Sequence, residues 1–401
     1  MSVIKMPLKY KRNIQMSKDT LYNKYRPLVF DDVKGQDDIV RVLKNQIKND
    51  RLSHAYLFSG IRGTGKTTVA RIFARAINCE HPVDGNPCNE CETCRKILAD
   101  NSINYREWNA ASRGLITDIK DIQEEIRTRP VVGNYRVYVI DETQTMKPAA
   151  VNAFLKTLEE PPEYVVFILC TTDFTNMPQA LMSRCQRYIF KRFDNSLIIS
   201  EINSVLKNEN RTLSKQSALQ IAMRAEGSMR DALSLLDRVL SYTSDQEVPY
   251  DLVLQILGMQ DIRRFDQFMH FIASGKTGKA LQICNEFLSG GMTEQQVTSD
   301  FLDYLRDLIL IKSGGDESII PVTSDQLKVL EESANEFSED TIYTVMGPFD
   351  ELSKTMRNTV ERKILLEVAI VRACRALDDS VRVDYEQRIA AIEEKLIKIQ
   401  V

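Results

Sequence analysis

The stretch Gly60-Ile61-Arg62-Gly63-Thr64-Gly65-Lys66-Thr67 decides the fold of this chain. It has the pattern G-x-x-x-x-G-K-[ST], with an apolar run at residues 55–58 before it and a helical pattern at residues 67–76 after it. In this order of strand, loop and helix, glycines let backbone N–H groups turn toward phosphate oxygens beside the positive end of a helix. A glycine-rich turn with an incidental lysine is the alternative, and the flanking segments disfavour it. The stretch therefore predicts a phosphate-binding loop in an α/β domain.

Two side chains at the end of this loop have specific expected roles. Lys66 is expected to reach the β- and γ-phosphates of ATP, and the Thr67 hydroxyl is expected to hold Mg²⁺. The residues expected to contact the nucleotide here are Gly60, Ile61, Arg62, Gly63, Thr64, Gly65, Lys66, Thr67 and Thr68.

Upstream of the loop, residues 21–35 are expected to form an extended entry segment, and residues 37–49 an amphipathic helix. Tyr25, Arg26 and Pro27 are candidates to lie across the adenine base, because an aromatic ring and a guanidinium group both offer stacking faces. The alternative, a loop anchored by its apolar residues, stays open.

An apolar strand pattern at residues 136–140 ends in two acids, Asp141 and Glu142. A carboxylate at a strand tip beside a phosphate loop can hold the Mg²⁺ shell, and the next carboxylate can polarise an attacking water. We therefore expect Asp141 to be the magnesium residue and Glu142 to be the catalytic base.

Polar residues at two later strands are candidates to contact the γ-phosphate. The strand predicted at residues 165–169 is followed by Thr171 and Thr172, of which Thr172 is the first choice and Thr171 the alternative. Arg184 stands just before a short strand predicted at residues 187–190. Its guanidinium can pair with phosphate, on a nucleotide that the sequence does not identify.

Four of the eight cysteines have metal-ligand spacing, Cys79-x8-Cys88-x2-Cys91-x2-Cys94. Four thiolates so spaced can close tetrahedrally around Zn²⁺, and the metal would staple an insertion, residues 79–94, that is too small to fold alone. A redox pair or four unrelated thiols are the alternatives, and His81 is an outside candidate for a ligand. The other four, Cys170, Cys185, Cys284 and Cys374, have apolar neighbours and are expected to be small core residues.

Residues 195–242 show helical patterns without strands, which predicts a second, smaller domain. Within it, Ser228 is the expected N-cap of a helix, and Arg230 lies in the first turn of that helix. Arg230 is a candidate to fold back onto the γ-phosphate, with an ordinary surface arginine near Asp231 as the alternative.

Residues 262–376 are predicted to form amphipathic helices broken at Gly275, Gly290-Gly291, Gly314-Gly315 and Gly347-Pro348. They contain no acid-base constellation, so this region is expected to hold partners rather than perform chemistry. The expected organisation is a basic arm (1–20), a nucleotide-binding domain (21–194), a lid (195–258), an oligomerisation domain (259–377) and a charged helix (378–401).

The net charge of −3 means that any DNA contact must come from a local patch. The candidate is a helix predicted at residues 114–127, whose apolar face is Leu115, Ile119, Ile122 and Ile126 and whose nearby positive charges are Arg113, Lys120, Arg127 and Arg129. A solvated helix face is the alternative. No apolar run approaches the ~20 residues needed to cross a bilayer, and residues 1–18 lack an apolar central region, which predicts a cytoplasmic protein.

Six motifs occur in one order over residues 21–240: the phosphate loop, the four-cysteine insertion, the Asp-Glu strand, the Thr-Thr-Asp strand, Ser-Arg-Cys and Gly-Ser-Met-Arg-Asp-Ala. Together they closely resemble the tau/gamma subunits of bacterial DNA polymerase III, the ATPases of the sliding-clamp loader. The cysteine insertion and the segment 155–162, followed by Ser183-Arg184-Cys185, distinguish this family from P-loop ATPases in general.

The resemblance implies an AAA+ fold with a five-stranded parallel sheet, a helical lid and a helical collar. The collar would assemble a pentamer from copies of the chain with delta and delta-prime type subunits. The resemblance also implies that Arg184 acts in trans on the neighbouring subunit's ATP and that Arg230 is a second sensor. ATP binding would close the ring around the sliding clamp, and primer-template DNA would trigger hydrolysis and release.

Two features depart from the family pattern. Thr143 and Gln144 follow Asp141-Glu142, where an apolar residue and then His are usual; Gln144 keeps a hydrogen-bonding amide but cannot take a proton. The chain also stops near residue 401, so we expect a gamma-like loader without the long tau tail and its polymerase and helicase contacts.

Two other functions compete with a clamp-loader motor. One is a structural clamp-loader subunit with weak or no ATPase activity, which the presence of Lys66, Thr67, Asp141, Glu142 and Arg184 disfavours. The other is a Holliday-junction motor, which the cysteine insertion and the lack of a C-terminal winged-helix pattern disfavour.

Overall fold

The computed structural model describes residues 20–113, 115–130, 133–243, 245–258, 260–315, 320, 322, 324–356 and 359–377. The arm predicted at 1–20, apart from its last residue, and the helix predicted at 378–401 lie outside the described residues. The chain divides into two compact units. The first comprises Glu209 and the residues before it together with Arg224–Ser241; the second comprises Asn210–Met223 and the residues from Tyr242 onward.

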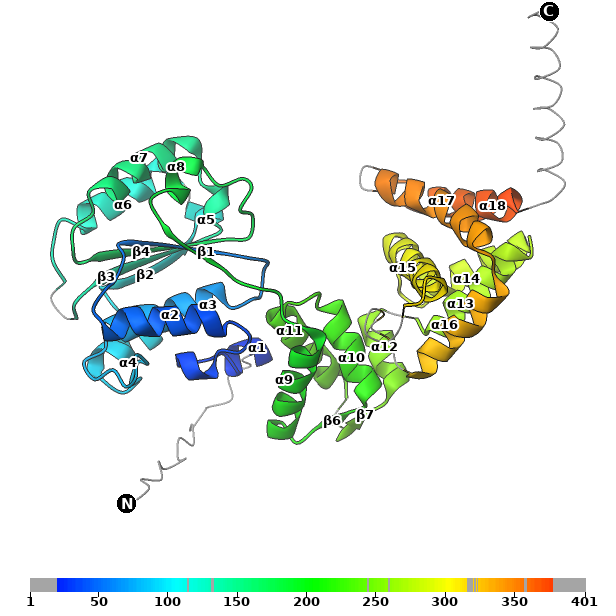
Figure 1. Ribbon diagram of the computed structural model, residues 1–401, viewed down its shortest axis with the longest axis horizontal. Helices are drawn as coiled ribbons and strands as arrows, with labels where there is room; N and C mark the ends of the chain where they lie inside the picture. The colour runs from blue at the N-terminus through cyan, green and yellow to red at the C-terminus, as the bar shows by residue number, and fades with distance from the viewer. Residues whose placement is uncertain are drawn as a thin grey trace, which may run out of the picture. The chain divides into compact units, whose positions relative to one another are not determined.

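The first unit is built on a five-stranded parallel sheet in the order β2-β3-β4-β1-β5 (Figure 1). Its strands are β1 (Ala55–Ser59), β2 (Tyr105–Asn109), β3 (Arg136–Asp141), β4 (Val165–Thr171) and β5 (Gln186–Ile189). The predicted parallel sheet is confirmed by the pairing of these strands. Because β3, β4 and β1 are neighbours, the polar segments that follow them meet at one edge of the sheet.

Helices cover both faces of this sheet, with α2, α3 and α4 on one face and α6 and α7 on the other (Figure 1). The helices of this unit are α1 (Leu21–Lys24), η1 (Phe30–Asp32), α2 (Asp37–Lys48), α3 (Lys66–Ile77), α4 (Glu92–Leu98), α5 (Ala110–Arg113), α6 (Ile116–Glu125), η2 (Thr143–Thr145), α7 (Pro148–Glu159), α8 (Gln179–Met182), α9 (Asn195–Asn208) and α11 (Met229–Tyr242, whose last residue belongs to the second unit).

Alternate residues of the central strands enter two separate cores. Tyr56 and Phe58 of β1 face the core that includes α2 and α3. Leu57, between them, faces the core that includes α6 and α7. All five residues of β1 are therefore buried, as expected for a parallel strand covered on both faces. This packing fixes the position from which the phosphate loop starts.

The entry segment at residues 21–35 is not extended as predicted, because it contains the short helices α1 and η1. The N–H groups of Asn23 and Lys24 donate to the Thr20 carbonyl oxygen at 2.9 and 3.0 Å, and buried Leu21 anchors this turn in the core. The turn ends before Pro27, as expected because a proline disfavours helical backbone in the residue before it.

The helix predicted at residues 114–127 is confirmed as α6, which begins and ends two residues inside the predicted bounds, but one residue of its predicted apolar face is misplaced. The Asp118 carboxylate accepts a hydrogen bond from the Leu115 N–H at 2.9 Å and starts a new helix there. Leu115 is 46% exposed, so it does not share the buried face of Ile119.

The second unit contains a two-stranded parallel sheet and helices. Its elements are β6 (Thr212–Leu213), α10 (Lys215–Arg224, whose last residue belongs to the first unit), β7 (Glu247–Val248), α12 (Tyr250–Leu257), α13 (Ile262–Ala273), α14 (Thr277–Ser289), α15 (Glu294–Lys312), α16 (Ser324–Glu336), α17 (Glu339–Thr355) and α18 (Arg362–Ala376). The prediction that residues 195–242 lack strands is wrong at β6, whose two residues are too few to show alternation. No helix among the described residues is long and apolar enough to cross a membrane.

The prediction that Gly347-Pro348 breaks a helix is also wrong, because α17 continues through Pro348. A proline inside a helix costs about 3 kcal/mol. Val345 and Phe349 flank it on the buried side of α17, and the Phe349 ring lies 4.8 Å from the Phe301 ring of α15. We attribute the continuous helix to this packing, which outweighs the local cost.

Candidate nucleotide site and metal centre

The phosphate loop joins β1 to α3, and its geometry requires two of its glycines. Gly65, directly before α3, has a φ of +97°, a conformation that glycine adopts without strain. Gly63 has a φ of +80°, and a Cβ atom there would lie 1.9 Å from the Ser228 Oγ atom. The start of α11 therefore lies directly on the phosphate loop.

Lys66 is folded onto this loop. Its Nζ atom donates to the carbonyl oxygens of Gly60 and Ile61, both at 2.8 Å. The residue is 6% exposed, and burial lowers the pKa of its ammonium group. The two carbonyl oxygens thus supply the polar partners that a desolvated ammonium group requires.

The two predicted magnesium ligands meet in the structure. The Thr67 hydroxyl, in the first turn of α3, donates to the Asp141 Oδ2 atom at the end of β3 at 3.0 Å. Glu142 follows with a φ of +52°, which is uncommon for a residue other than glycine. Its N–H donates to the Asp141 Oδ1 atom at 2.9 Å, which fixes the aspartate from its other oxygen.

A carboxamide connects the Glu142 carboxylate to the end of β4. The Gln144 Nε2 atom donates to Glu142 Oε2 at 2.5 Å and to Thr172 Oγ1 at 2.9 Å. The Thr171 hydroxyl donates to Gln144 Oε1 at 2.7 Å, and the Thr172 hydroxyl donates to Glu142 Oε2 at 3.1 Å. Gln144 therefore joins the acid to both threonines without itself being able to titrate.

One cavity of about 180 Å³ in the first unit collects most of the predicted nucleotide contacts. Its lining includes Tyr25, Arg26, Pro27, Arg62, Gly63, Thr64, Gly65, Lys66, Thr67, Thr68, Asp141, Glu142, Thr172 and Arg230. Gly60 and Ile61 are outside the lining, although their carbonyl oxygens hold Lys66. Thr171 is also outside it and is completely buried.

The sequence analysis missed several residues of this cavity, among them Tyr22, Val33, Phe193, Met229 and Leu233. They come from α1, from the segment after η1, from the segment after β5 and from α11, and no spacing connects them. Only the fold brings them together. Four of them are apolar, so they supply a wall of the kind that ligand pockets commonly use.

Arg184 lies apart from the cavity of its own chain. Its NH2 group pairs with the Glu159 Oε1 atom at 2.5 Å, and its NH1 group donates to the Ala180 carbonyl oxygen at 2.9 Å. The side chain is 33% exposed. The guanidinium is thus oriented by α7 and α8, with part of its surface open to solvent.

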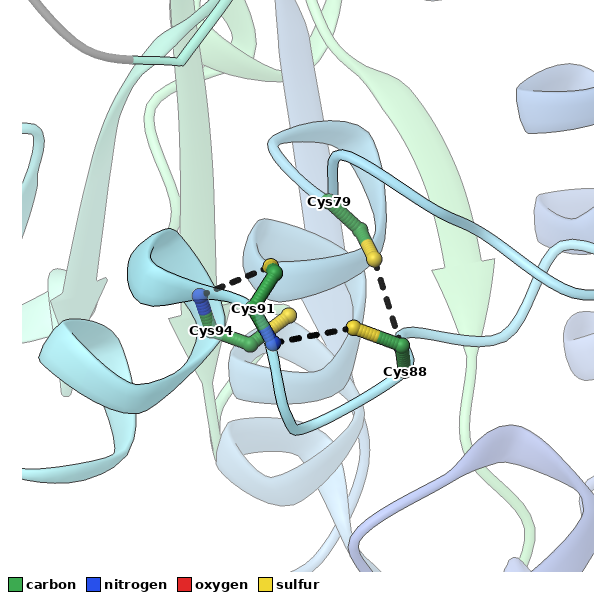
Figure 2. Close-up of side chains that lie close together, drawn as sticks. All are labelled: Cys79, Cys88, Cys91 and Cys94. Carbon is green, nitrogen blue, oxygen red and sulfur yellow. Dashed lines mark hydrogen bonds between the residues drawn. The ribbon is translucent and has the colours of Figure 1, made fainter.

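The four clustered cysteines converge between α3 and α4 (Figure 2). Their sulfur atoms all lie within 4.8 Å of one another, and the cluster contains Cys79, Cys88, Cys91 and Cys94. Tetrahedral zinc with Zn–S bonds of ~2.3 Å requires sulfur atoms roughly 3.8 Å apart, so small side-chain shifts would close the site. His81 is exposed and is not a member of the cluster.

Backbone N–H groups point at these sulfur atoms. The Cys88 N–H donates to the Cys79 sulfur at 3.2 Å, the Cys91 N–H to the Cys88 sulfur at 3.3 Å and the Cys94 N–H to the Cys91 sulfur at 3.4 Å (Figure 2). Burial raises the pKa of Cys88, but the N–H groups of Glu90 and Cys91 more than offset this and lower it to about 7. This arrangement fits thiolate ligands, which a metal requires.

The basic side chains considered for DNA contact, Arg113, Lys120, Arg127 and Arg129, are all exposed. Arg129 lies 5.5 Å from the centre of the Tyr164 ring. Exposed acids, Asp121 and Glu124, alternate with these charges along the same segment.

Three segments of the chain match DNA polymerase III families. Residues 35–194 match "DNA polymerase III, delta subunit", residues 197–245 match "DNA polymerase III clamp loader subunit, ATPase lid domain", and residues 248–388 match "DNA polymerase III subunits gamma and tau domain III". DNA polymerase III subunit tau of Bacillus subtilis is 38% identical over 371 residues, which cover 91% of this chain. The chain belongs to the DNA polymerase III tau/gamma family. The predicted AAA+ α/β fold is confirmed by these matches and by the parallel sheet.

This tau/gamma chain spans only part of the length of its relatives. It covers 65% of the Bacillus subtilis subunit and 46% of Escherichia coli subunit tau, to which it is 35% identical over 74% of itself. Among solved structures, the Thermotoga maritima RuvB Holliday junction branch migration motor is 18% identical, with a TM-score of 0.44, over 62% of this chain and 79% of its own. Because the chain belongs to the tau/gamma family, the alternative function of a Holliday-junction motor is dropped.

Proposed function

We propose that this chain is the ATP-binding and hydrolysing motor subunit of a DNA polymerase sliding-clamp loader. The observation that carries the proposal is the contact of Thr67 with Asp141 at 3.0 Å, beside Lys66 and Glu142, in one cavity of a tau/gamma family chain. A lysine, a hydroxyl and two carboxylates around a phosphate loop are the parts that phosphoryl transfer to water requires.

The proposed roles follow the positions of these side chains. Lys66 leaves the loop carbonyls to bind the β- and γ-phosphates, and Thr67 and Asp141 hold Mg²⁺, which neutralises charge on the phosphates. Glu142 accepts a proton from the attacking water. Thr172, which is already bonded to Glu142, senses the γ-phosphate. Tyr25, Arg26 and Pro27 remain the proposed adenine contacts.

Arg184 is proposed to complete the site of a neighbouring subunit. Its exclusion from the cavity of its own chain and its partly open guanidinium support a role in trans. An arginine supplied by a neighbour makes hydrolysis depend on assembly, because the positive charge reaches the phosphates only when two subunits are in contact. Its pairing with Glu159 keeps the guanidinium oriented until then.

The wider proposal retains the domain boundaries given above and a cytoplasmic location. The chain would assemble with copies of itself and with delta and delta-prime type subunits, bind the sliding clamp, and act on primer-template DNA. We retain the exposed basic cluster as the candidate DNA-facing surface; it consists of Arg113, Lys120, Arg127 and Arg129. The acids Asp121 and Glu124 between these residues reduce its positive electrostatic potential.

The test is ATP hydrolysis by the chain mixed with its cognate delta-type subunits, with and without clamp and primed DNA. We expect the rate to rise when clamp and primed DNA are added together. ATP binding without hydrolysis under any of these conditions would favour the alternative of a structural subunit. A rate that responds to neither addition would contradict the clamp-loader function.

We also propose that the cysteine cluster binds one Zn²⁺ ion that stabilises the insertion. Cys88→Ser is expected to lower zinc content from one per chain toward zero, because a hydroxyl is a poor substitute for a thiolate ligand. The thermal midpoint should fall as well. Metal analysis and calorimetry of the purified chain measure both quantities.

Cys185→Ser is the matched control, because Cys185 is partly buried but lies outside the cluster. It should leave the zinc content unchanged. A parent chain that contains no zinc after expression with the metal, or a Cys88→Ser chain that retains it in full, would contradict the proposed metal centre.

A further inference from the structure

Arg230 contacts the ring of Tyr22, a residue that the sequence analysis did not single out. Its guanidinium carbon lies 4.9 Å from the centre of the Tyr22 ring, which belongs to α1. The Tyr22 hydroxyl also forms hydrogen bonds with Thr20 and with the Arg230 guanidinium, and both lower the pKa of that hydroxyl. Arg230 of the lid helix α11 therefore contacts both the ring of Tyr22, through a cation–π interaction, and its hydroxyl.

Helix α1 is itself held in place by α9. The Lys24 Nζ atom and the Tyr25 hydroxyl both donate to the Glu209 Oε1 atom, at 2.6 and 2.5 Å. Glu209 directly follows α9. Buried Leu21 fixes the other side of α1 in the core. Tyr22 is thus a fixed platform at the cavity and not a ring on a free chain end.

The Arg230 side chain also starts close to the phosphate loop, so it could turn toward a bound phosphate. Its Cβ atom lies 3.2 Å from the position that a Cβ atom on Gly63 would occupy. Arg26, which also lines this cavity, has a pKa lowered by its burial and then by the like charges of Arg71 and Arg230. The Coulomb energy of these positive charges falls when an anion enters among them.

We propose that Tyr22 is a positioning residue that holds Arg230 away from the phosphate loop until a nucleoside triphosphate draws it there. The inference rests on the proposed function and deepens it. A contact that stabilises the nucleotide-free state weakens triphosphate binding by the same free energy. A diphosphate lacks the γ-phosphate that attracts Arg230, so the contact between Tyr22 and Arg230 does not weaken its binding in this way.

The experiment compares the parent chain with Tyr22→Ala and Tyr22→Phe. Calorimetry measures the Kd values of Mg²⁺ with ADP and of Mg²⁺ with an ATP analogue that is not hydrolysed. Tyr22→Ala is expected to bind the ATP analogue about two- to five-fold more tightly, which corresponds to the loss of one exposed cation–π contact. Its Kd for ADP should not fall in parallel, so the ratio of the Kd for ADP to the Kd for the analogue should rise by that factor. Tyr22→Phe keeps the aromatic ring but loses the hydroxyl, so its affinity for the analogue should lie between those of Tyr22→Ala and the parent.

The Arg230→Ala background is the decisive control. There the Tyr22→Ala change should no longer affect binding of the ATP analogue, because the partner of the ring is absent. An equal effect on ADP and the analogue, weaker analogue binding, or an effect that persists without Arg230 would overturn the inference.

A separate measurement distinguishes failure of this inference from failure of the proposed function. If the parent chain binds no adenine nucleotide, the proposed function is wrong, but the contact can still be tested. The NMR resonances of the Arg230 side chain in the nucleotide-free protein should shift in Tyr22→Ala and shift less in Tyr22→Phe. Unchanged resonances in Tyr22→Ala would show that Tyr22 does not hold Arg230.

Discussion

Replacement of Lys66 with alanine is expected to lower ATP hydrolysis by about 10²- to 10³-fold, the usual cost of removing one preorganised charge from developing phosphate charge. Binding of Mg²⁺ with ATP should weaken as well. The fold should persist, because the partners of Lys66 are two carbonyl oxygens of the loop and not a carboxylate that would be left unpaired. Steady-state hydrolysis, calorimetric binding and thermal unfolding measure these effects.

Lys354→Ala is the matched control for this change, because Lys354 is 73% exposed on α17 and pairs with nearby Asp350. It should hydrolyse ATP at the parent rate. If Lys66→Ala hydrolysed ATP as fast as the parent, the assignment of the nucleotide site to the phosphate loop would be wrong.

Arg184→Ala is expected to lower hydrolysis in the assembled loader by roughly 10³- to 10⁵-fold, the range observed for arginines supplied in trans. ATP affinity should change little, because Arg184 does not line the cavity of its own chain. Arg187→Ala is the control: this exposed arginine on β5 lies against the Phe174 ring, and its loss should leave the rate unchanged.

A mixing experiment decides between action in trans and in cis. Arg184→Ala and Lys66→Ala chains, each inactive alone, are assembled together with the delta-type subunits. If Arg184 acts on the neighbouring nucleotide, a Lys66→Ala chain supplies its arginine to the intact site of an Arg184→Ala chain, and part of the activity returns. No recovery, in assemblies shown to contain both variants, would contradict the trans role.

Several features of the fold were predictable because they depend on local sequence. The strands at Ala55–Ser59 and Val165–Thr171 are buried throughout, because both faces of the sheet are covered, and this burial shows in the sequence as apolar runs. The convergence of Cys79, Cys88, Cys91 and Cys94 was predictable because short spacings restrict how far the sulfur atoms can separate.

The errors lie where local preference and tertiary packing disagree. Pro348 predicts a helix end, yet α17 continues through it because its flanking side chains are buried in the helical core. Leu115 was placed on a buried helix face, but the Asp118 carboxylate starts a new helix there and leaves Leu115 exposed. Hydrophobic periodicity reflects neither the packing of the residues beside Pro348 nor the hydrogen bond that Asp118 accepts at the start of α6.

The sequence by itself determined the glycine-rich loop between β1 and α3, the order of strands along the chain, the cluster of four cysteines and the family, because each is encoded by residues close together or by motifs in a fixed order. Tertiary structure alone decided which side chains meet. It brought the Thr67 hydroxyl to Asp141, put Gln144 between Glu142 and Thr172, and laid Arg230 on Tyr22. Such contacts join residues dozens to hundreds of positions apart, or depend on a backbone turn such as that at Glu142, and their free energies arise only after the sheet and its helices have packed.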